Sequence, residues 1–109
     1  SRLGLKLTVV LLNNEGGGIF NFLPVASQGA AFETHIATPT GLDFAQAAAL
    51  YGCAYARVTD LEGLADALMS ALAGGDSTII EIRTERVANR QLHADVEAAA
   101  VAALARPVA

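Results

Sequence analysis

Cysteine is scarce in this sequence of 109 residues, which contains only Cys53, and tryptophan is absent. A lone cysteine cannot form an internal disulfide, which excludes a small secreted scaffold held together by disulfides. The low cysteine content suits a reducing compartment, so we expect a cytoplasmic protein. Because Cys53 stands in an apolar setting between Tyr51 and Tyr55, we expect it to pack in the interior rather than to act as a nucleophile.

Charged residues are also few, at 17% of the chain, and the net charge is −4. The seven basic residues are scattered, which argues against a nucleic-acid-binding protein. The exception is a small group, Arg83, Arg86 and Arg90, which we expect to be solvated or paired with acidic side chains. No apolar run reaches the roughly 18–20 residues that a membrane-spanning helix needs, so no membrane span is predicted.

Apolar residues, by contrast, make up 53% of the chain, and the mean hydropathy is +0.43. A small domain exposes much of its surface and ordinarily needs more polar residues than this. A segment of a larger sheet would have such a composition, because surfaces covered by the rest of the protein are apolar. The length leaves room for one small domain, and the sequence contains no internal repeat or linker.

Apolar patterning divides the chain into alternating strands and helices. The predicted strands are Leu5–Leu12, Ala54–Val58 and Ser77–Ile82. The predicted helices are a short piece at Ile19–Leu23 and longer ones at Phe44–Tyr51, Leu61–Ala73 and Asn89–Leu104, with an irregular connection over Val25–Thr40. This alternation is typical of an α/β fold with a short parallel sheet flanked by helices.

Aspartates and glycines mark the ends of the predicted helices. Asp43 and Asp60 are expected N-caps, and Gly52 and Gly74 are expected stops. The strand Leu5–Leu12 is expected at an edge of the sheet, where a second copy of the chain covers it. One apolar face of helix 61–73 is expected to be buried, and it consists of Leu61, Leu64, Ala65, Leu68, Met69 and Leu72.

The most informative stretch lies at the end of the first predicted strand. Residues 8–12 are β-branched or apolar without alternation, as in a strand buried on both faces, and Asn13 and Asn14 follow directly. Ligands of parallel α/β sheets bind outside this carboxyl end. The side-chain oxygen of Asn14 and the main-chain oxygen of Gly16 suit a hard cation such as Mg²⁺. The alternative is a glycine-rich turn with no ligand.

A family resemblance extends this pattern. Residues 13–24, which read Asn-Asn-Glu-Gly-Gly-Gly-Ile-Phe-Asn-Phe-Leu-Pro, resemble the second half of the motif of thiamine-diphosphate-dependent enzymes. The Gly-Gly-x-Ile-Phe-x-x-Leu-Pro continuation resembles the 2-succinyl-5-enolpyruvyl-6-hydroxy-3-cyclohexene-1-carboxylate synthase family of menaquinone biosynthesis. Residues 38–44 resemble the segment before that family's next helix, and residues 80–86, with Asn89 and His93, resemble its C-terminal signature.

The resemblance implies that residues 1–109 form the C-terminal part of a thiamine-diphosphate-binding (pyrophosphate) domain, an α/β three-layer sandwich. The sequence begins with Ser1, and the Gly-Asp half of the motif is absent from it. The family's activating glutamate belongs to an N-terminal domain that is also absent. We therefore expect no catalytic residue in the chain and no activity from the chain alone.

The same resemblance implies individual roles. Asn14 and Gly16 would be metal ligands for Mg²⁺ or Mn²⁺, which bridges the phosphates of thiamine diphosphate. Gly17 and Gly18 would let the backbone approach the diphosphate, with the amides that open the short helix as donors. The expected cofactor-binding residues are Asn14, Gly16, Gly17, Gly18 and Ile19, and the expected substrate-pocket residues are Ile19, Phe20 and Leu23. Two neighbours have other expected roles, because Asn13 is expected to shape the turn and Glu15 to face outward.

For the whole protein, the resemblance implies a transferase that decarboxylates 2-oxoglutarate and adds the succinyl-semialdehyde carbanion to isochorismate. Such an enzyme acts on small-molecule substrates, needs its remaining domains, and is expected to be a homo-oligomer. Two alternatives stay open. One is another thiamine-diphosphate enzyme, of the acetolactate synthase or pyruvate decarboxylase type, and the other is a non-catalytic α/β interaction module.

Four further residues receive no catalytic role. We expect His35 in a surface loop and His93 on the surface of the last helix. Glu81 is expected either to face solvent or to pair with an arginine, and Phe22 is expected to pack in the core.

Overall fold

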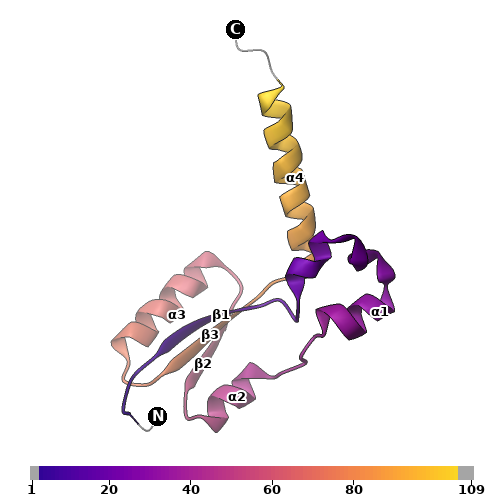
Figure 1. Cartoon of the computed structure of the whole chain (residues 1–109). Coiled ribbons are helices and arrows are strands. Elements are labelled where there is room, and N and C mark those ends of the chain that lie inside the picture. The colour runs from indigo at the N-terminus through magenta and orange to yellow at the C-terminus, as the bar shows by residue number, and fades with distance from the viewer. Residues whose placement is uncertain (1–2, 106–109) are drawn as a thin grey trace. The chain divides into compact units, whose positions relative to one another are not determined.

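The computed structural model of the protein describes residues 3–105 (Figure 1). It contains two compact units. The first, which we call the sheet unit, comprises the chain up to Asn13 together with Thr40–Thr84. The second, the loop unit, comprises Asn14–Pro39 together with the chain from Glu85 onward.

The sheet unit contains a three-stranded parallel sheet. Its strands are β1 (Thr8–Asn13), β2 (Ala54–Val58) and β3 (Thr78–Arg83), in the order β1-β3-β2. The α/β prediction and the parallel sheet are therefore confirmed. The position of β2 matches its prediction, whereas β1 begins three residues later than predicted and β3 is displaced by one residue.

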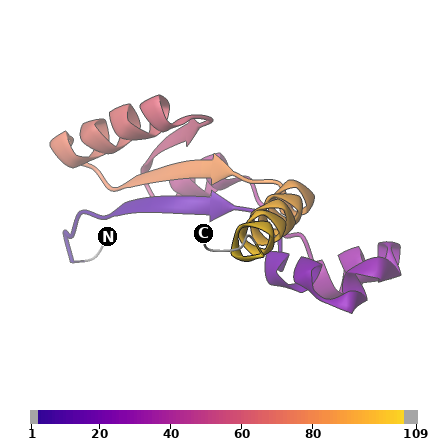
Figure 2. The same ribbon diagram turned by 90° about the horizontal axis from the view of Figure 1, so that it is seen from above.

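Two helices flank the sheet on opposite faces (Figures 1 and 2). They are α2 (Phe44–Leu50) and α3 (Leu61–Ala73). Both predicted N-caps are confirmed. The Asp43 carboxylate accepts hydrogen bonds from the amides of Ala45 and Gln46, at 2.9 and 3.2 Å, and the Asp60 carboxylate accepts one from Gly63 at 2.7 Å.

The core of the sheet unit lies between the sheet and α3. Val58, Ala71 and Ile80 are buried there, with Leu64, Ala67, Leu68 and Ile82 packed against them. The predicted buried face of α3 was therefore partly wrong, because Leu61, Met69 and Leu72 are exposed. The face of α3 that meets the sheet consists of two leucines and two alanines, Leu64, Ala67, Leu68 and Ala71.

The loop unit consists of short helical turns followed by one long helix. The turns are η1 (Gly18–Phe22), η2 (Pro24–Gln28), α1 (Ala30–Phe32) and the π-helical turn η3 (Glu33–Ala37). The expectation of an irregular connection over residues 25–40 was therefore wrong. Single turns carry no repeated apolar period, so sequence patterning does not reveal them.

The long helix is α4 (Arg86–Leu104), and it begins three residues earlier than predicted. Its N-cap is Glu85, whose carboxylate accepts a hydrogen bond from the amide of Ala88 at 2.7 Å. None of the residues Arg86–Leu104 is buried. Among the described residues, no helix has the length and apolar character needed to cross a membrane.

β1 lies at an edge of the sheet, as predicted. Its apolar side chains Val9, Val10 and Leu12 are exposed, as are Leu5 and Leu7 before it. An exposed apolar edge strand presents unpaired main-chain groups that favour pairing with another strand. What covers this edge stays a prediction.

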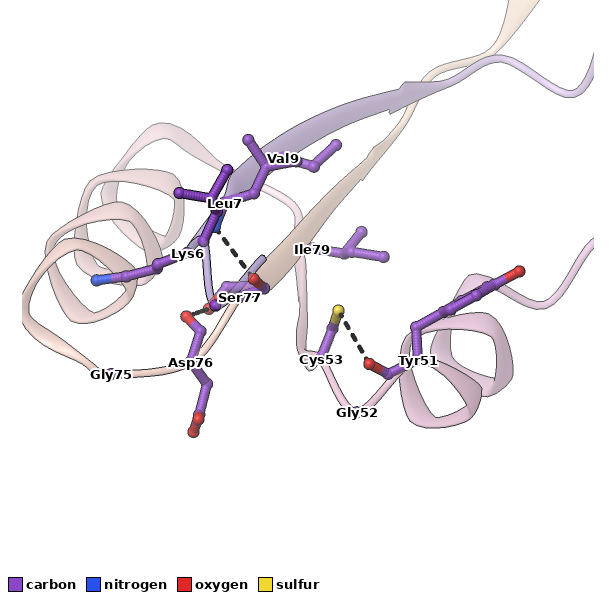
Figure 3. A pocket seen from close by; sticks show the side chains of 13 residues that line it. Lys6, Leu7, Val9, Tyr51, Gly52, Cys53, Gly75, Asp76, Ser77 and Ile79 are labelled. Carbon is purple, nitrogen blue, oxygen red and sulfur yellow. Dashed lines mark hydrogen bonds between the residues drawn. The ribbon is translucent and has the colours of Figure 1, made fainter. Parts of the chain in front are cut away.

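A cavity of about 540 Å³ opens at the amino ends of the strands (Figure 3). Its walls include Leu7, Ile79 and Cys53, and the cysteine is half-buried there rather than packed in the interior as expected. Beside it, the Lys6 ammonium donates to the carbonyl oxygens of Leu72 and Gly74, which end α3. This cavity lies at the opposite end of the sheet from Asn13.

Candidate cofactor and metal site

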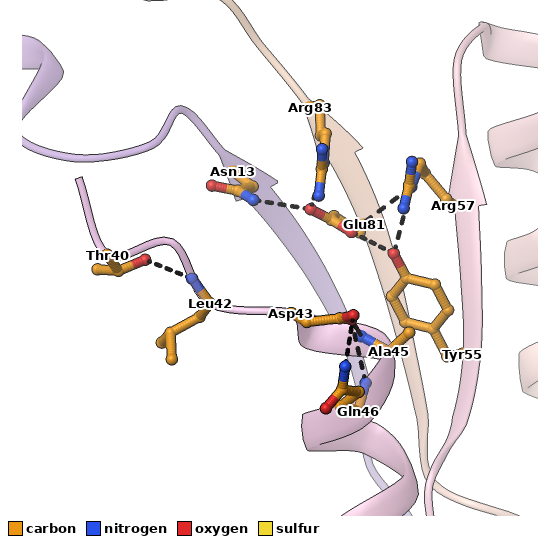
Figure 4. A network of polar contacts seen from close by, with 10 residues as sticks. All are labelled: Asn13, Thr40, Leu42, Asp43, Ala45, Gln46, Tyr55, Arg57, Glu81 and Arg83. Atoms are coloured by element: carbon orange, nitrogen blue, oxygen red, sulfur yellow. Dashed lines mark hydrogen bonds and ion pairs between the residues drawn. The ribbon is translucent and has the colours of Figure 1, made fainter.

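A buried carboxylate ties the three strands together at the carboxyl end of the sheet (Figure 4). Glu81 of β3 is fully buried. Its Oε1 accepts hydrogen bonds from Asn13 Nδ2 at 2.7 Å and from Arg83 Nε at 3.0 Å. Its Oε2 accepts a hydrogen bond from the Tyr55 hydroxyl and faces Arg57 Nε at 3.8 Å. The expected arginine pairing of Glu81 is confirmed, and the solvent-facing alternative is wrong.

The hydrogen bond from Asn13, followed by that from Tyr55, holds the pKa of Glu81 at about 2 against a usual 4.5. Glu81 is therefore ionised at neutral pH. Its position follows from strand alternation, because Ile80 and Ile82 face α3 and Glu81 points to the other side. Register then places Leu11 and Arg57 on either side of it.

Asn13 is thus a strand-anchoring residue. Its side chain binds Glu81, and its carbonyl oxygen accepts a hydrogen bond from the Thr84 amide at 2.9 Å. The expected role of Asn13 in the turn stays a prediction beside this anchoring role. The two asparagines of the motif therefore act in different units.

The turn itself is formed by residues 14–18 of the loop unit. Asn14 Oδ1 accepts a hydrogen bond from the Gly16 amide at 3.2 Å, and the Gly16 carbonyl oxygen accepts one from the Gly18 amide at 2.8 Å. Gly17, with φ −73° and ψ 65°, is the centre of an inverse γ-turn. Glu15, which is half-buried, adopts a left-handed φ of 55°. Residues 14–18 thus form two tight turns in succession, and this segment carries both predicted ligand oxygens, those of Asn14 and Gly16.

Close packing explains why glycine occupies this turn. Gly16 has a φ of 128°, and a Cβ atom there would collide with the carbonyl oxygen of Ala37. A Cβ atom at Gly18 would lie 2.6 Å from Asn14 Nδ2. Larger residues would therefore displace either the π-helical turn or the Asn14 side chain.

The residues present fit a divalent cation. Asn14 Oδ1 and the Gly16 carbonyl oxygen each accept one hydrogen bond, and an sp² oxygen has two lone pairs. Each oxygen therefore retains capacity for a ligand, and neutral oxygens are donors that Mg²⁺ accepts. Within residues 3–105, no three His, Cys, Asp or Glu side chains form a group that could hold a metal ion.

The amides of Gly17 and Gly18 form hydrogen bonds within the loop unit. The Gly17 amide donates to the Ala37 carbonyl oxygen at 2.8 Å, and the Gly18 amide donates within the γ-turn. Both donors are therefore engaged in main-chain hydrogen bonds. The remaining contribution of these two glycines is their small size, which allows a ligand to approach the backbone.

The expected pocket residues lie together on and beside η1. Ile19, Phe20 and Leu23 are all exposed, although Phe20 packs against Gly17, where a Cβ atom would lie 2.7 Å from its ring. Clustered exposed apolar side chains mark a binding or packing surface.

Sequence reasoning missed a set of contacts between α4 and η1. The Arg86 guanidinium binds Glu33 Oε2 at 2.6 Å and Asn21 Oδ1 at 3.4 Å. The Phe22 ring is exposed rather than in the core, and meets His93 edge-on at a centroid distance of 5.2 Å. Arg86 and His93 belong to the C-terminal signature, which was the only signal that pointed to them.

The arginine group is held by ion pairs and a ring contact, and both histidines lie on the surface. Arg83 and Arg86 are ion-paired, as expected, and the Arg90 guanidinium lies 5.5 Å from the centroid of the Phe22 ring. His35 is exposed on η3, and His93 is exposed on α4. The expected surface positions of both histidines are confirmed.

Comparison with known proteins identifies the class. The family described as thiamine pyrophosphate enzyme, C-terminal TPP binding domain, matches residues 1–82, and the chain belongs to this family. The α/β fold and the turn of residues 14–18 agree with that membership.

Relatives narrow the resemblance to 2-succinyl-5-enolpyruvyl-6-hydroxy-3-cyclohexene-1-carboxylate synthases. The enzyme of Bacillus velezensis is 48% identical over 100 residues, which cover 92% of this chain and 17% of the relative. That of Rubrobacter xylanophilus is 45% identical over 93 residues, covering 85% of the chain and 16% of the relative. The predicted resemblance to the C-terminal part of this synthase is confirmed, and the chain spans 17% or less of the length of these relatives.

Proposed function

We propose that this chain is the C-terminal part of the pyrophosphate domain of a 2-succinyl-5-enolpyruvyl-6-hydroxy-3-cyclohexene-1-carboxylate synthase, and that residues 14–18 hold the metal of its cofactor. The observation that carries the proposal is the double turn after β1. In this turn the Asn14 amide oxygen accepts a hydrogen bond from Gly16, whose own carbonyl oxygen is the second proposed ligand and whose position has no room for a Cβ atom.

In the complete enzyme, Asn14 and Gly16 would bind Mg²⁺ or Mn²⁺ through their oxygens. The cation would neutralise the diphosphate and anchor thiamine diphosphate, which supplies the carbanion chemistry when it is bound. The remaining metal ligand and the activating glutamate would come from other parts of the enzyme. Isolated, the 109 residues would therefore be inactive.

The proposed reaction is the one that the family resemblance implies, in which 2-oxoglutarate is decarboxylated and its succinyl-semialdehyde unit is transferred to isochorismate. Ile19, Phe20 and Leu23 would form an apolar wall of the substrate pocket. Such a wall excludes water and so protects a reactive unit during transfer. The exposed apolar edge at β1 supports the expectation that the other domains, or a second copy in a homo-oligomer, cover this sheet.

Calorimetry on the complete enzyme tests the metal site. Asn14→Ala should weaken the binding of thiamine diphosphate in the presence of Mg²⁺ by at least about tenfold, because one metal ligand is lost. Gln28→Ala is the matched control, since it removes an exposed amide from the same unit. Undiminished binding by Asn14→Ala would contradict the proposal and favour a purely structural turn.

The reaction itself needs a separate assay. An enzyme of the acetolactate synthase or pyruvate decarboxylase type would bind the same cofactor but consume pyruvate. Consumption of 2-oxoglutarate that depends on isochorismate is the expected result. Turnover of pyruvate without isochorismate would leave the cofactor site intact and reject the assigned substrates.

A further inference from the structure

Arg86 joins three segments of the loop unit that are far apart in the sequence. It is the first residue of α4, and its side chain is only 12% exposed. One terminal nitrogen binds Asn21 in η1, 65 residues away, and the other binds Glu33 in η3, 53 residues away. The planar guanidinium can satisfy both acceptors at once because its donors point in fixed, diverging directions.

The aliphatic stem of Arg86 makes a further contact with the turn. A Cβ atom at Gly18 would lie 3.5 Å from Arg86 Cγ, so the stem lies close to the glycine that packs against Asn14. Arg86 therefore contacts the turn at Gly18, its continuation at Asn21, and η3 at Glu33. The amide of Gly17 is bonded to η3 as well, through Ala37.

A second contact lies two turns along the same helix face. His93 meets the Phe22 ring edge-on, and Arg90 lies over that ring. Residues spaced by four and three positions share one face of a helix, so Arg86, Arg90 and His93 all point toward η1. Asn21 and Phe22 thus face α4, and they are the two residues that the Ile-Phe-x-x-Leu-Pro pattern leaves unspecified.

We propose that Arg86 is a positioning residue that holds residues 14–22 in the conformation that binds the metal and the diphosphate. The inference rests on the proposed function. Each terminal nitrogen of Arg86 binds a protein oxygen, and its side chain is only 12% exposed, which favours a role through the loop over direct binding of the phosphates.

If Arg86 has this role, the direction in which a substitution of Glu33 changes cofactor affinity can be predicted. Glu33→Gln removes the carboxylate that orients the guanidinium and should weaken cofactor binding. If Arg86 bound a phosphate directly, the same change would release a competing anion and would strengthen binding. Glu33 is 48% exposed at its side chain, so the substitution should leave the protein folded.

The experiment measures two quantities in the complete enzyme. The first is the Kd for thiamine diphosphate at a fixed Mg²⁺ concentration, and the second is amide hydrogen exchange over residues 14–23 without cofactor. Arg86→Met should raise the Kd by about tenfold, as removal of residues that orient ligands commonly does, and should accelerate exchange in this segment. Arg86→Lys should give a Kd and an exchange rate between those of Arg86→Met and the unchanged enzyme. An ammonium can still pair with Glu33, but it lacks the diverging donors of a guanidinium.

Glu33→Gln should raise the Kd less than Arg86→Met and should accelerate exchange in the same segment. Glu62→Gln, an exposed substitution on α3, is the matched control and should change neither quantity. Tighter or unchanged binding by Glu33→Gln, or unchanged exchange over residues 14–23 in Arg86→Met, would overturn the inference. Failure of the metal site itself would appear separately, as undiminished binding by Asn14→Ala.

Discussion

In the sheet unit, Val58, Ala71 and Ile80 exclude water between the sheet and α3, and a buried carboxylate joins the strands on the other face. In the loop unit, no residue of α4 is buried, and the short turns are linked by main-chain hydrogen bonds and one ion pair. The sheet unit has a packed core beneath α3, whereas the loop unit buries only Phe32 and Ala37 among its described residues and takes its shape also from glycine conformations and polar contacts. Binding loops commonly come from such regions of low local stability.

The largest expected effect concerns the sheet unit. Glu81→Ala should lower the free energy of unfolding by about 3 kcal/mol, because it removes the buried carboxylate that accepts hydrogen bonds from Asn13, Tyr55 and Arg83. Urea unfolding of the chain measures the change. Glu62→Ala, an exposed control on α3, should have little effect. An equal loss in both variants would contradict the assigned role of the network.

The contribution of Glu81 to the stability of the sheet unit should also depend on pH. The folded pKa of Glu81 lies near 2, below its usual 4.5, so its stabilising contribution is complete above about pH 5 and is lost as the pH falls toward 2. The caps Asp43 and Glu85, whose pKa values are lowered chiefly by backbone amides, act in the same direction. Urea unfolding between pH 2 and 6 should show a shallower decline for Glu81→Gln. If stability declines equally steeply with falling pH in Glu81→Gln and in the unchanged chain, protonation of Glu81 is not the cause of the decline.

The loop unit should respond locally. Gly16→Ala forces an alanine into a positive φ and into collision with Ala37, at a cost of about 2 kcal/mol. Hydrogen exchange over residues 14–37 should therefore accelerate, with little change over β3. Gly29→Ala is the control for backbone strain without a collision, because Gly29 also has a positive φ but open space around it. Equal effects would show that the collision is unimportant.

The smallest effect is expected on self-association through β1, the exposed edge strand of the sheet. Because Leu12 of β1 is 66% exposed, the chain should self-associate at high concentration in sedimentation experiments. Leu12→Lys should weaken the association, whereas Leu50→Lys, on the exposed side of α2, should not. A monomeric chain at high concentration would contradict pairing with a second copy and leave the edge to other domains.

Local signals in the sequence predicted much of this structure. Asp43 and Asp60 cap helices through amides two or three residues away, so their roles can be read from adjacent positions. The alternation of apolar segments predicted the parallel sheet for the same reason. The motif around Asn14 indicated the family. The hydrogen bond from Asn13 to Glu81 could not be predicted in this way, because Glu81 lies in β3, far along the sequence.

The sequence by itself determined the order of the strands and longer helices, the caps Asp43 and Asp60, and the presence of two oxygen donors around a glycine turn, because each depends on neighbours within a few residues. Only the tertiary structure decided that Glu81 is buried, that α3 turns its alanines to the sheet, and that Arg86 joins Asn21 to Glu33. The partners of Glu81 lie up to 68 residues away and those of Arg86 up to 65. Contacts over such separations exist only in the folded chain, since tertiary packing decides which distant side chains become neighbours.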